Sequence, residues 1–559
     1  MKYSALPAVD KGKESFSMKI VIIGGVAAGT KAAAKLKREN RDYEVLILTK
    51  GKDISYAGCG LPYYVGKVIE DKGQLIVNTP QSFSKLTGAE VRTRTEVTAI
   101  DRAAKKVTAV DLESGEKSEY PYDKLIIAVG ADPVRLPIDG IDLPGVYTMR
   151  TPDDAIRLRE AVEAGEIKRA AVIGGGYIGL EIAENLMEMG VRASVIEMLP
   201  HVLPGFDPEM AEYAENKMAD AGVMVFTGTK LVGIEGEGKV EKIRTEKRAM
   251  KADAVIMSVG IRPNTAFLAD SGIELMPNQT IKVNAEMRTN DEDIYAVGDC
   301  ACVVNAQTHA SAWSPMGSSA NIEGRLVART IAGDKREYRG VLGTAVAKLA
   351  GINVARTGLT EADALKAGYD AVSVVTVVDD KAHYYPDASS FVVKMIADRQ
   401  TLKLLGIQVI GTGAVDKMAD ITVTAINMGA TLHDVEDMDL AYAPPFSTAI
   451  HPFTHTVNVL LNKISGDFET ITPAQYAQGM AEGYQVVDLS LQPSIEGAPY
   501  VDLTTIIDKM AGFEDKNEKL LLVCTKGKRA YMAQNRLKHC GYKNTRVLEG
   551  GTTVNEIEL

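Results

Sequence analysis

The feature that most constrains the fold is a strand, a glycine-rich turn and a helix, which occur in this order twice. The first strand and turn read KIVIIGG, at Lys19–Gly25, and the second read RAAVIGG, at Arg169–Gly175. A helical segment follows each turn and leads to a second apolar strand, at Glu44–Leu48 and at Ala193–Glu197. This order begins a βαβ unit with parallel strands. The sequence therefore predicts an α/β protein with two Rossmann-like domains.

The second copy carries a complete G-x-G-x-x-G pattern at Gly174–Gly179. Gly174 permits the tight turn, Gly176 lets a pyrophosphate approach the backbone, and Gly179 allows the helix to pack closely on the strand. Glu197 ends the next strand, where a carboxylate accepts the ribose 2′-hydroxyl and repels a 2′-phosphate. A glycine turn without a ligand is the alternative. Strand, helix and acid together favour a dinucleotide site that prefers NADH to NADPH.

The first copy is less complete and is interpreted with the help of a distant segment. It keeps the outer glycines, Gly24 and Gly29, but has Val26 at the middle position, and its second strand is followed by Lys50 without the usual acid. Far along the chain, the apolar segment TNDEDIYAVGD ends at Asp299. A carboxylate at such a strand end can bind the ribityl hydroxyls of a flavin. We therefore expect an FAD site that includes Gly24, Gly29, Lys50 and Asp299.

Cys59 is the candidate redox residue. It lies in the segment SYAGCGLPYY, which begins at Ser55 and contains no second cysteine. A turn of small residues can expose a sulfur to a flat ring, and nearby helix N-termini can lower a thiol pKa. An inert buried cysteine is the alternative, but two neighbouring dinucleotide sites favour the redox role.

The composition excludes several classes of protein. Five cysteines in 559 residues do not make a disulfide framework, so the cytoplasm is the expected location. Cys300, Cys302 and Cys540 are expected to be ordinary core or surface residues, and no metal site is predicted because the histidines do not cluster with them. A net charge of −11 argues against a nucleic-acid partner. No apolar run reaches the roughly 18 residues of a membrane helix, so no membrane partner is expected.

Together these segments resemble the pyridine nucleotide–disulfide oxidoreductases. The resemblance spans about Met18 to Ser465 and is greatest to the branch with a single redox cysteine, which includes coenzyme A disulfide reductases, NADH oxidases and NADH peroxidases. Members with two cysteines carry the second one five residues after the first, where this chain has Tyr64. Peroxidases and water-forming oxidases have a histidine where this chain has Ala27. The resemblance therefore implies reduction by NADH of coenzyme A disulfide, coenzyme A persulfide or polysulfide through Cys59.

Two other functions remain open on the sequence. One is an NADH oxidase that passes electrons to oxygen. The other is a redox-sensing interaction protein that docks a partner without turnover.

The resemblance also implies roles for three tyrosines. In the family a tyrosine at the position of Tyr177 lies in the nicotinamide site until NADH displaces it. Tyr384 and Tyr442 match a pair that reaches across a homodimer interface to the partner's Cys59. A phenol there can donate a proton to a leaving thiolate, although packing at the interface explains the pair equally well.

Three cations after the first glycine turn are candidate contacts for coenzyme A. Lys31, Lys35 and Arg38 share one helix face by their spacing. In the family this helix holds the phosphates of coenzyme A, whereas the plainer interpretation is a solvated face. Ser55, which begins the cysteine segment, is the fourth candidate substrate contact.

The C-terminal segment resembles a rhodanese domain. An apolar strand at Leu520–Val523 leads into the loop Cys524–Ala530, which carries three cations. Such a loop stabilises a thiolate or persulfide, so Cys524 is a candidate carrier of sulfane sulfur. The segment Ser490–Ala498 departs from the rhodanese pattern, with Ser490 where arginine is usual.

Between these parts we expect an α+β dimerisation domain. Strand-like runs at Ala371–Val378 and Phe391–Ile396 precede a helical stretch at Ala414–Asn427. The expected division of the chain is an N-terminal extension at 1–17, an FAD domain at 18–150 and 282–337, an NADH domain at 151–281, the dimerisation domain at 338–465 and a rhodanese-like domain at 466–559.

Overall fold

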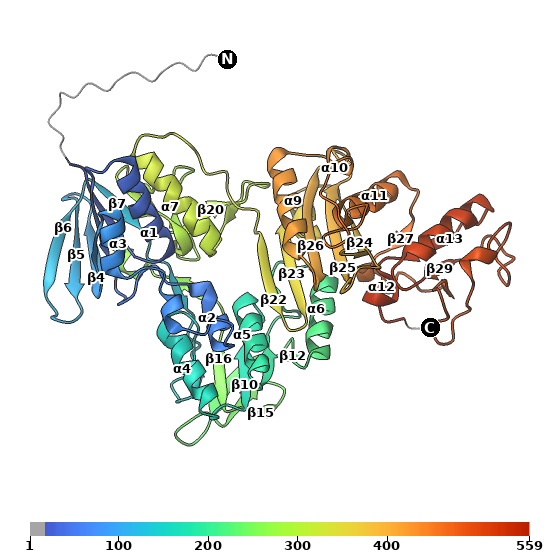
Figure 1. The fold of residues 1–559 in the computed structure, drawn as a ribbon, viewed down its shortest axis with the longest axis horizontal. Helices are drawn as coiled ribbons and strands as arrows, with labels where there is room; N and C mark the ends of the chain where they lie inside the picture. Colours follow the sequence, from blue (N-terminus) through green and yellow to red (C-terminus); the bar gives the residue numbers. More distant parts are fainter. Residues whose placement is uncertain (1–16, 558) are drawn as a thin grey trace, which may run out of the picture.

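The computed structural model describes residues 17–557 and 559 (Figure 1). Apart from Ser17, the predicted N-terminal extension lies outside the described residues. The chain forms four units around separate sheets, and the predicted α/β class is confirmed. The first dinucleotide unit and the C-terminal unit lie at opposite ends of the long axis (Figure 1). In the described part of the chain no helix is long and apolar enough to cross a membrane.

The first dinucleotide unit contains a parallel five-stranded sheet. Its strands, in spatial order, are β19 (Ile294–Ala296), β7 (Lys124–Ile127), β1 (Lys19–Ile23), β2 (Glu44–Leu48) and β3 (Glu90–Arg92). Helix α1 (Ala27–Glu39) lies beside α7 (Gly317–Ile331) in this unit (Figure 1). Because β19 comes from far along the chain, the second unit is an insertion into the first.

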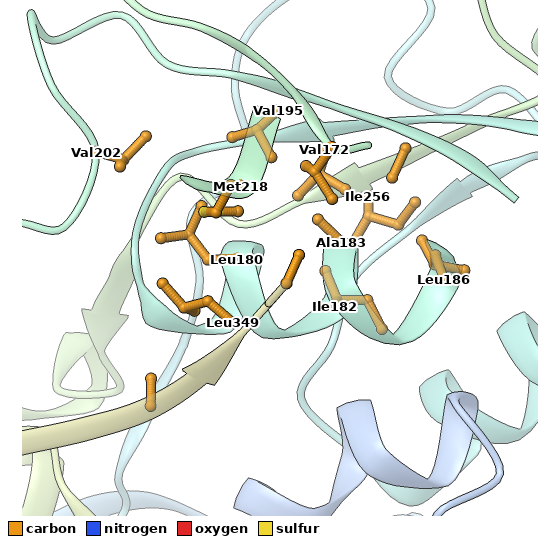
Figure 2. Close-up of a cluster of buried hydrophobic side chains, with 14 of the residues drawn as sticks. Val172, Leu180, Ile182, Ala183, Leu186, Val195, Val202, Met218, Ile256 and Leu349 are labelled. Carbon is orange, nitrogen blue, oxygen red and sulfur yellow. The ribbon is translucent and has the colours of Figure 1, made fainter. Parts of the chain in front are cut away.

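The second unit repeats this architecture. Its parallel strands, in spatial order, are β12 (Met224–Phe226), β11 (Arg192–Ile196), β10 (Arg169–Ile173), β16 (Ala254–Met257) and β9 (Val146–Tyr147). Helix α5 (Tyr177–Glu188) covers the sheet with an apolar face. Figure 2 shows this core with side chains from strands, from α5 and from the next domain: Val172, Val195, Ile256, Leu180, Ile182, Leu186 and Leu349.

The third unit is an antiparallel sheet with helices. Its strands, in spatial order, are β22 (Ala345–Leu349), β23 (Ile352–Gly358), β26 (Leu404–Gly411), β25 (Ser390–Asp398) and β24 (Ala371–Asp379). The two predicted strand runs are confirmed as β24 and β25, and the predicted helix as α9 (Val415–Met428). Helix α11 (Pro452–Ser465) packs against β24 and β25.

The C-terminal unit has a parallel four-stranded sheet. Its strands, in spatial order, are β27 (Thr470–Ile471), β30 (Thr545–Leu548), β29 (Leu520–Val523) and β28 (Gln485–Asp488). Helix α13 (Lys528–His539) follows β29. Glu549, which is fully buried, joins this unit to the third one, because its carboxylate accepts from Lys463 Nζ at 2.6 Å and from the Val375 backbone at 2.7 Å.

Candidate functional site

The two glycine turns have the same backbone geometry. Gly24 and Gly174 both have φ of 108°, a conformation that side chains rarely adopt. A Cβ atom would lie 2.1 Å from the Ala128 carbonyl oxygen in the first turn and 2.3 Å from that of Ser258 in the second. Only glycine fits either position, so the chain has built the same tight turn twice.

The helix that follows each turn is free to bind an anion. Within the described chain, neither Val26 before α1 nor Gly176 before α5 caps its helix with a side chain. The first backbone N–H groups are therefore available to phosphate oxygens. A Cβ atom at Gly176 would meet nothing within 4 Å, so the space beside the second turn is open. These features suit the predicted pyrophosphate sites, and binding at both turns stays a prediction.

Glu197 is held beside the second turn. Its carboxylate accepts from the backbone N–H of Gly175 at 2.6 Å and from that of Leu199 at 2.7 Å. These bonds fix a negative charge at the end of β11, next to the glycine turn. The position suits the predicted contact with a ribose, and that role stays a prediction.

Tyr177 begins α5 with an unsatisfied hydroxyl. Its Oη atom is buried and has no hydrogen-bond partner among the described residues. Burial raises the pKa of this phenol to about 12. A buried hydroxyl without a partner is costly, so a ligand that bonded to it or displaced the ring would relieve that cost.

The predicted flavin contacts differ in their surroundings. Asp299 lies on the short helix η4 (Gly298–Cys300), and its Oδ2 atom is 3.5 Å from an Arg150 Nη2 atom. Burial raises the pKa of this carboxyl, and Arg150 opposes that shift. Lys50 is exposed and pairs with Glu96 at 2.8 Å. Asp299 is therefore a partly buried anion with one cation beside it, whereas Lys50 already has a partner.

Cys59 lies where the two dinucleotide units meet. It is on the short helix η1 (Gly58–Gly60) and is exposed. The surrounding protein still desolvates the thiol and raises its pKa, and Glu181 and Asp299 raise it further while Arg150 lowers it. Nearby helix N-termini can lower a thiol pKa, but the net shift in the chain by itself is upward. The thiol is near enough to feel one carboxylate from each unit.

Ser55 connects the cysteine segment to the first glycine turn. Its backbone N–H donates to the Gly25 carbonyl at 2.9 Å, and its φ is 48°. This contact holds the start of the segment against the predicted flavin site.

A pair that the sequence analysis missed lies beside Cys59. Tyr63, on α2 (Leu61–Val65), donates its hydroxyl to Glu181 Oε1 at 3.0 Å. Burial raises the pKa of Glu181 to about 7, and the bond from Tyr63 opposes the shift. The one signal in the sequence was spacing, because Glu181 follows Tyr177 by one helical turn and so shares its face of α5.

Tyr384 and Tyr442 come together on the surface. The hydrogen bond with the Tyr442 hydroxyl raises the pKa of Tyr384. Both side chains are largely exposed, and the loops that carry them also expose Tyr385, Phe446 and Ile450. We call these five residues the tyrosine patch. A cluster of exposed aromatic and aliphatic side chains is typical of a surface that another molecule covers.

The three cations of α1 lie on one uninterrupted helix. Lys35 pairs with Glu39 on the next turn. Lys31 and Arg38 make no ion pair with any residue that the structure describes. Two of the three cations among the predicted coenzyme A contacts are thus available to an anion.

Comparisons with known proteins bear on all four units. The family model of the pyridine nucleotide-disulphide oxidoreductases matches residues 18–316, that of their dimerisation domain matches 344–453, and a rhodanese-like domain matches 470–554. The chain belongs to the pyridine nucleotide-disulphide oxidoreductase family. It is an NAD(P)H-dependent flavoprotein oxidoreductase whose cofactors are FAD and a nicotinamide dinucleotide.

Several members of this family resemble the chain closely. The NAD(P)H sulfur oxidoreductase (CoA-dependent) of Pyrococcus furiosus is 35% identical over 79% of this chain and 99% of its own length. The structure of reduced Bacillus anthracis CoADR-RHD has 31% identity and a TM-score of 0.91, and it covers 97% of this chain and 98% of the other. The NAD-dependent persulfide reductase from A. fulgidus has 34% identity and a TM-score of 0.90, with coverages of 96% and 100%.

The rhodanese-like domain holds Cys524 in a loop whose cations are mostly engaged. Cys524 is buried directly after β29. Lys526 pairs with Asp379 of the dimerisation domain at 2.6 Å, and Arg529 donates to the Leu489 carbonyl at 2.8 Å. Two of the three cations that were expected to serve an anionic sulfur are thus already bound to protein.

Hydrogen bonds to Asp488 stabilise the segment Ser490–Ala498, which departs from the rhodanese pattern. The carboxylate of Asp488 accepts backbone N–H bonds from Ser490 at 2.9 Å, Ser494 at 2.6 Å and Ile495 at 3.0 Å. These bonds contribute to a lowered pKa of Asp488, against the effect of its burial. A turn held by these hydrogen bonds begins at Ser490, the position where arginine is usual.

Of the remaining cysteines, Cys300 directly follows Asp299 on η4. Cys300 and Cys302 are buried and Cys540 is partly buried, as expected of core and surface residues. Among the described residues no group of histidines, cysteines and carboxylates could hold a metal ion.

Proposed function

We propose that the protein uses NADH to reduce coenzyme A disulfide, coenzyme A persulfide or polysulfide through Cys59. The observation that carries this proposal is that Cys59 is exposed on the short helix η1, between Gly58 and Gly60, where the two dinucleotide units meet. The names of the relatives support it, since they include a CoA-dependent sulfur oxidoreductase and a persulfide reductase. Tyr64 occupies the position of a second cysteine, so the substrate supplies the sulfur–sulfur bond.

The chemistry follows from the residues around the thiol. The Cys59 thiolate attacks the coenzyme A sulfur of the persulfide, releases hydrosulfide and forms a mixed disulfide. Bound FAD supplies the transfer of an electron pair from NADH, which cleaves that disulfide and returns the thiolate. The net reaction consumes one persulfide, one NADH and one proton, and yields coenzyme A, hydrogen sulfide and NAD⁺.

In this proposal the working unit is a homodimer. The tyrosine patch forms part of the interface, and Tyr384 and Tyr442 donate protons to the thiol that leaves the partner's Cys59. Lys31, Lys35 and Arg38 bind the phosphates of coenzyme A, and Ser55 contacts it near the thiol. The dimerisation domain and the two exposed tyrosines support this arrangement.

The rhodanese-like domain adds a relay in the same proposal. Cys524 accepts sulfane sulfur and presents it to coenzyme A, which makes the persulfide that Cys59 reduces. Covalent attachment keeps the two sites at a high effective concentration. A cytoplasmic location completes the proposal, and the five free cysteines suit a reducing compartment.

The test compares Cys59→Ser with Cys540→Ser, which removes another accessible cysteine. NADH oxidation is measured with coenzyme A disulfide, coenzyme A persulfide, polysulfide and oxygen as acceptors. Cys59→Ser should abolish turnover of the sulfur substrates and leave the reduction of FAD by NADH intact, whereas Cys540→Ser should keep both. Native rates of sulfur reduction in Cys59→Ser would refute the proposal, and oxygen as the best acceptor would favour an oxidase.

A further inference from the structure

We propose that Asp379 of the dimerisation domain is a specificity-determining residue for Cys524, and that it disfavours small dianionic sulfur donors such as thiosulfate. This inference rests on the proposed relay of sulfane sulfur through Cys524. It concerns which donor can load that cysteine.

An ion pair joins the dimerisation domain to the loop of Cys524. Lys526 Nζ is 2.6 Å from Asp379 Oδ1 and donates to Ser390 Oγ at 2.8 Å. The side chains of Lys526 and Asp379 are 41% and 38% exposed, so solvent and small solutes reach the pair. A donor that needs the Lys526 charge must therefore compete with Asp379.

The charges around the loop leave a small positive excess. Arg529 lies 3.4 Å from Asp502, which is its acidic partner. Lys528 is exposed and makes no ion pair within the described part of the chain. Burial and the nearby Lys528 lower the pKa of His455, so that ring is neutral at neutral pH. Three cations thus face two carboxylates, and one positive charge remains, which suits a monoanion better than a dianion.

The two domains are joined firmly at this place. The buried Glu549 accepts from Lys463 and from the backbone of Val375. Two residues further along, Gly551 packs on the Cys524 carbonyl so closely that a Cβ atom would lie 1.8 Å away from that oxygen. Asp379 is therefore held beside the Cys524 loop as a fixed part of its surroundings.

The transfer that Asp379 disfavours takes place in two steps. The Cys524 thiolate attacks the outer sulfur of thiosulfate, the sulfur–sulfur bond breaks, and sulfite leaves with the electron pair. Cyanide then takes the outer sulfur as thiocyanate and returns the thiolate. A small alkyl persulfide with one negative charge delivers the same sulfur and leaves as a thiolate.

The experiment measures thiocyanate formation by the full-length holoenzyme with each of these two donors. Asp379→Asn should raise kcat/KM for thiosulfate about two- to fivefold, the size expected for one partly exposed charge, and change the persulfide value little. The gain should shrink at high salt. The control is Asp370→Asn, which removes a matched exposed carboxylate that faces Arg399. It should change neither the thiosulfate value of kcat/KM nor the persulfide value. Adding Lys526→Met to Asp379→Asn should remove the gain.

The outcomes separate this inference from the proposed function. An unchanged donor ratio in Asp379→Asn overturns the role of Asp379, even where Cys524→Ala abolishes transfer and so supports the relay. Full transfer by Cys524→Ala overturns the relay and the role of Asp379 with it. Reduction of preformed coenzyme A persulfide, which uses Cys59 and does not pass through Cys524, should be native in all these variants.

Discussion

At the scale of single residues, the site combines a thiol with charges that oppose its ionisation. Burial raises the pKa of Cys59, Glu181 and Asp299 raise it further, and Arg150 counters them. The chain by itself therefore keeps the thiol protonated more than a free cysteine would be. We infer that the bound cofactors supply the stabilisation that the thiolate requires.

Glu181→Gln should make Cys59 more reactive above pH 7. The pKa of Glu181 is about 7, so its negative charge is present above that pH and absent well below it. Removing the charge lowers the thiol pKa. The alkylation rate of Cys59, measured against pH in a Cys540→Ser background, should exceed that of the parent above pH 7 and match it near pH 5. Glu188→Gln, an exposed carboxylate on the same helix, is the control. An equal gain at pH 5 would contradict the electrostatic explanation.

Glu197 should set the preference between nicotinamide cofactors. Its carboxylate is fixed beside the glycine turn and would face a 2′-phosphate. We expect discrimination of about 1–3 kcal/mol, or roughly tenfold to two hundredfold in kcat/KM, in favour of NADH. In Glu197→Gln, the ratio of kcat/KM for NADH to kcat/KM for NADPH should fall most of the way to one. Steady-state rates with both cofactors measure this ratio. Equal efficiency of the native enzyme with NADPH would show that the carboxylate does not contact the ribose.

At the scale of elements, the sequence predicts helices, strands and turns from local patterns, but it does not predict contacts between residues that are far apart along the chain. The glycine turns, β24, β25 and the strand before Cys524 follow from periodicity and turn chemistry within a few residues. By contrast, Lys394 lies within the apolar strand β25, where sequence gives no hint of its partners. The structure surrounds it with Asp207, Glu209 and Glu361 at 3.2, 2.6 and 2.7 Å. The same limit hid the Tyr63–Glu181 pair, whose members are 118 positions apart.

This buried cluster should lock the NADH domain to the dimerisation domain. Lys394 is almost fully buried, and Lys394→Met would leave three carboxylates without their cation. Breaking a buried pair in this way costs about 3–5 kcal/mol, so the urea midpoint of the variant should fall clearly in circular dichroism. Lys403→Met, which changes an exposed lysine beside the same sheet, should leave it unchanged. A native midpoint in Lys394→Met would show that the cluster contributes no net stability.

At the scale of the whole molecule, Tyr384 and Tyr442 belong to a different domain from Cys59. The tyrosine patch is on the surface of the dimerisation domain, and Tyr384 and Tyr442 contact each other there. Sequence could predict these two residues through their family pattern, but not that neighbouring apolar side chains would be exposed with them. In the proposed homodimer, a second copy would cover the patch, bury these apolar side chains and bring the two phenols to the site of the other chain.

Mixed dimers test this arrangement directly. One chain carries Cys59→Ser and the other carries Tyr384→Phe with Tyr442→Phe, and different affinity tags isolate the hybrid. If the tyrosines act across the interface, the hybrid contains one site with a native cysteine and two native tyrosines, and one site that lacks all three. Its turnover of coenzyme A persulfide should then be about half that of the native dimer and well above that of either parent homodimer. If the tyrosines serve the cysteine of their own chain, no site is complete, and the hybrid should be no more active than a mixture of the parents. Binding of NADH, which needs neither the cysteine nor the tyrosines, should be native in every case, so that an inactive hybrid reports on placement and not on misfolding.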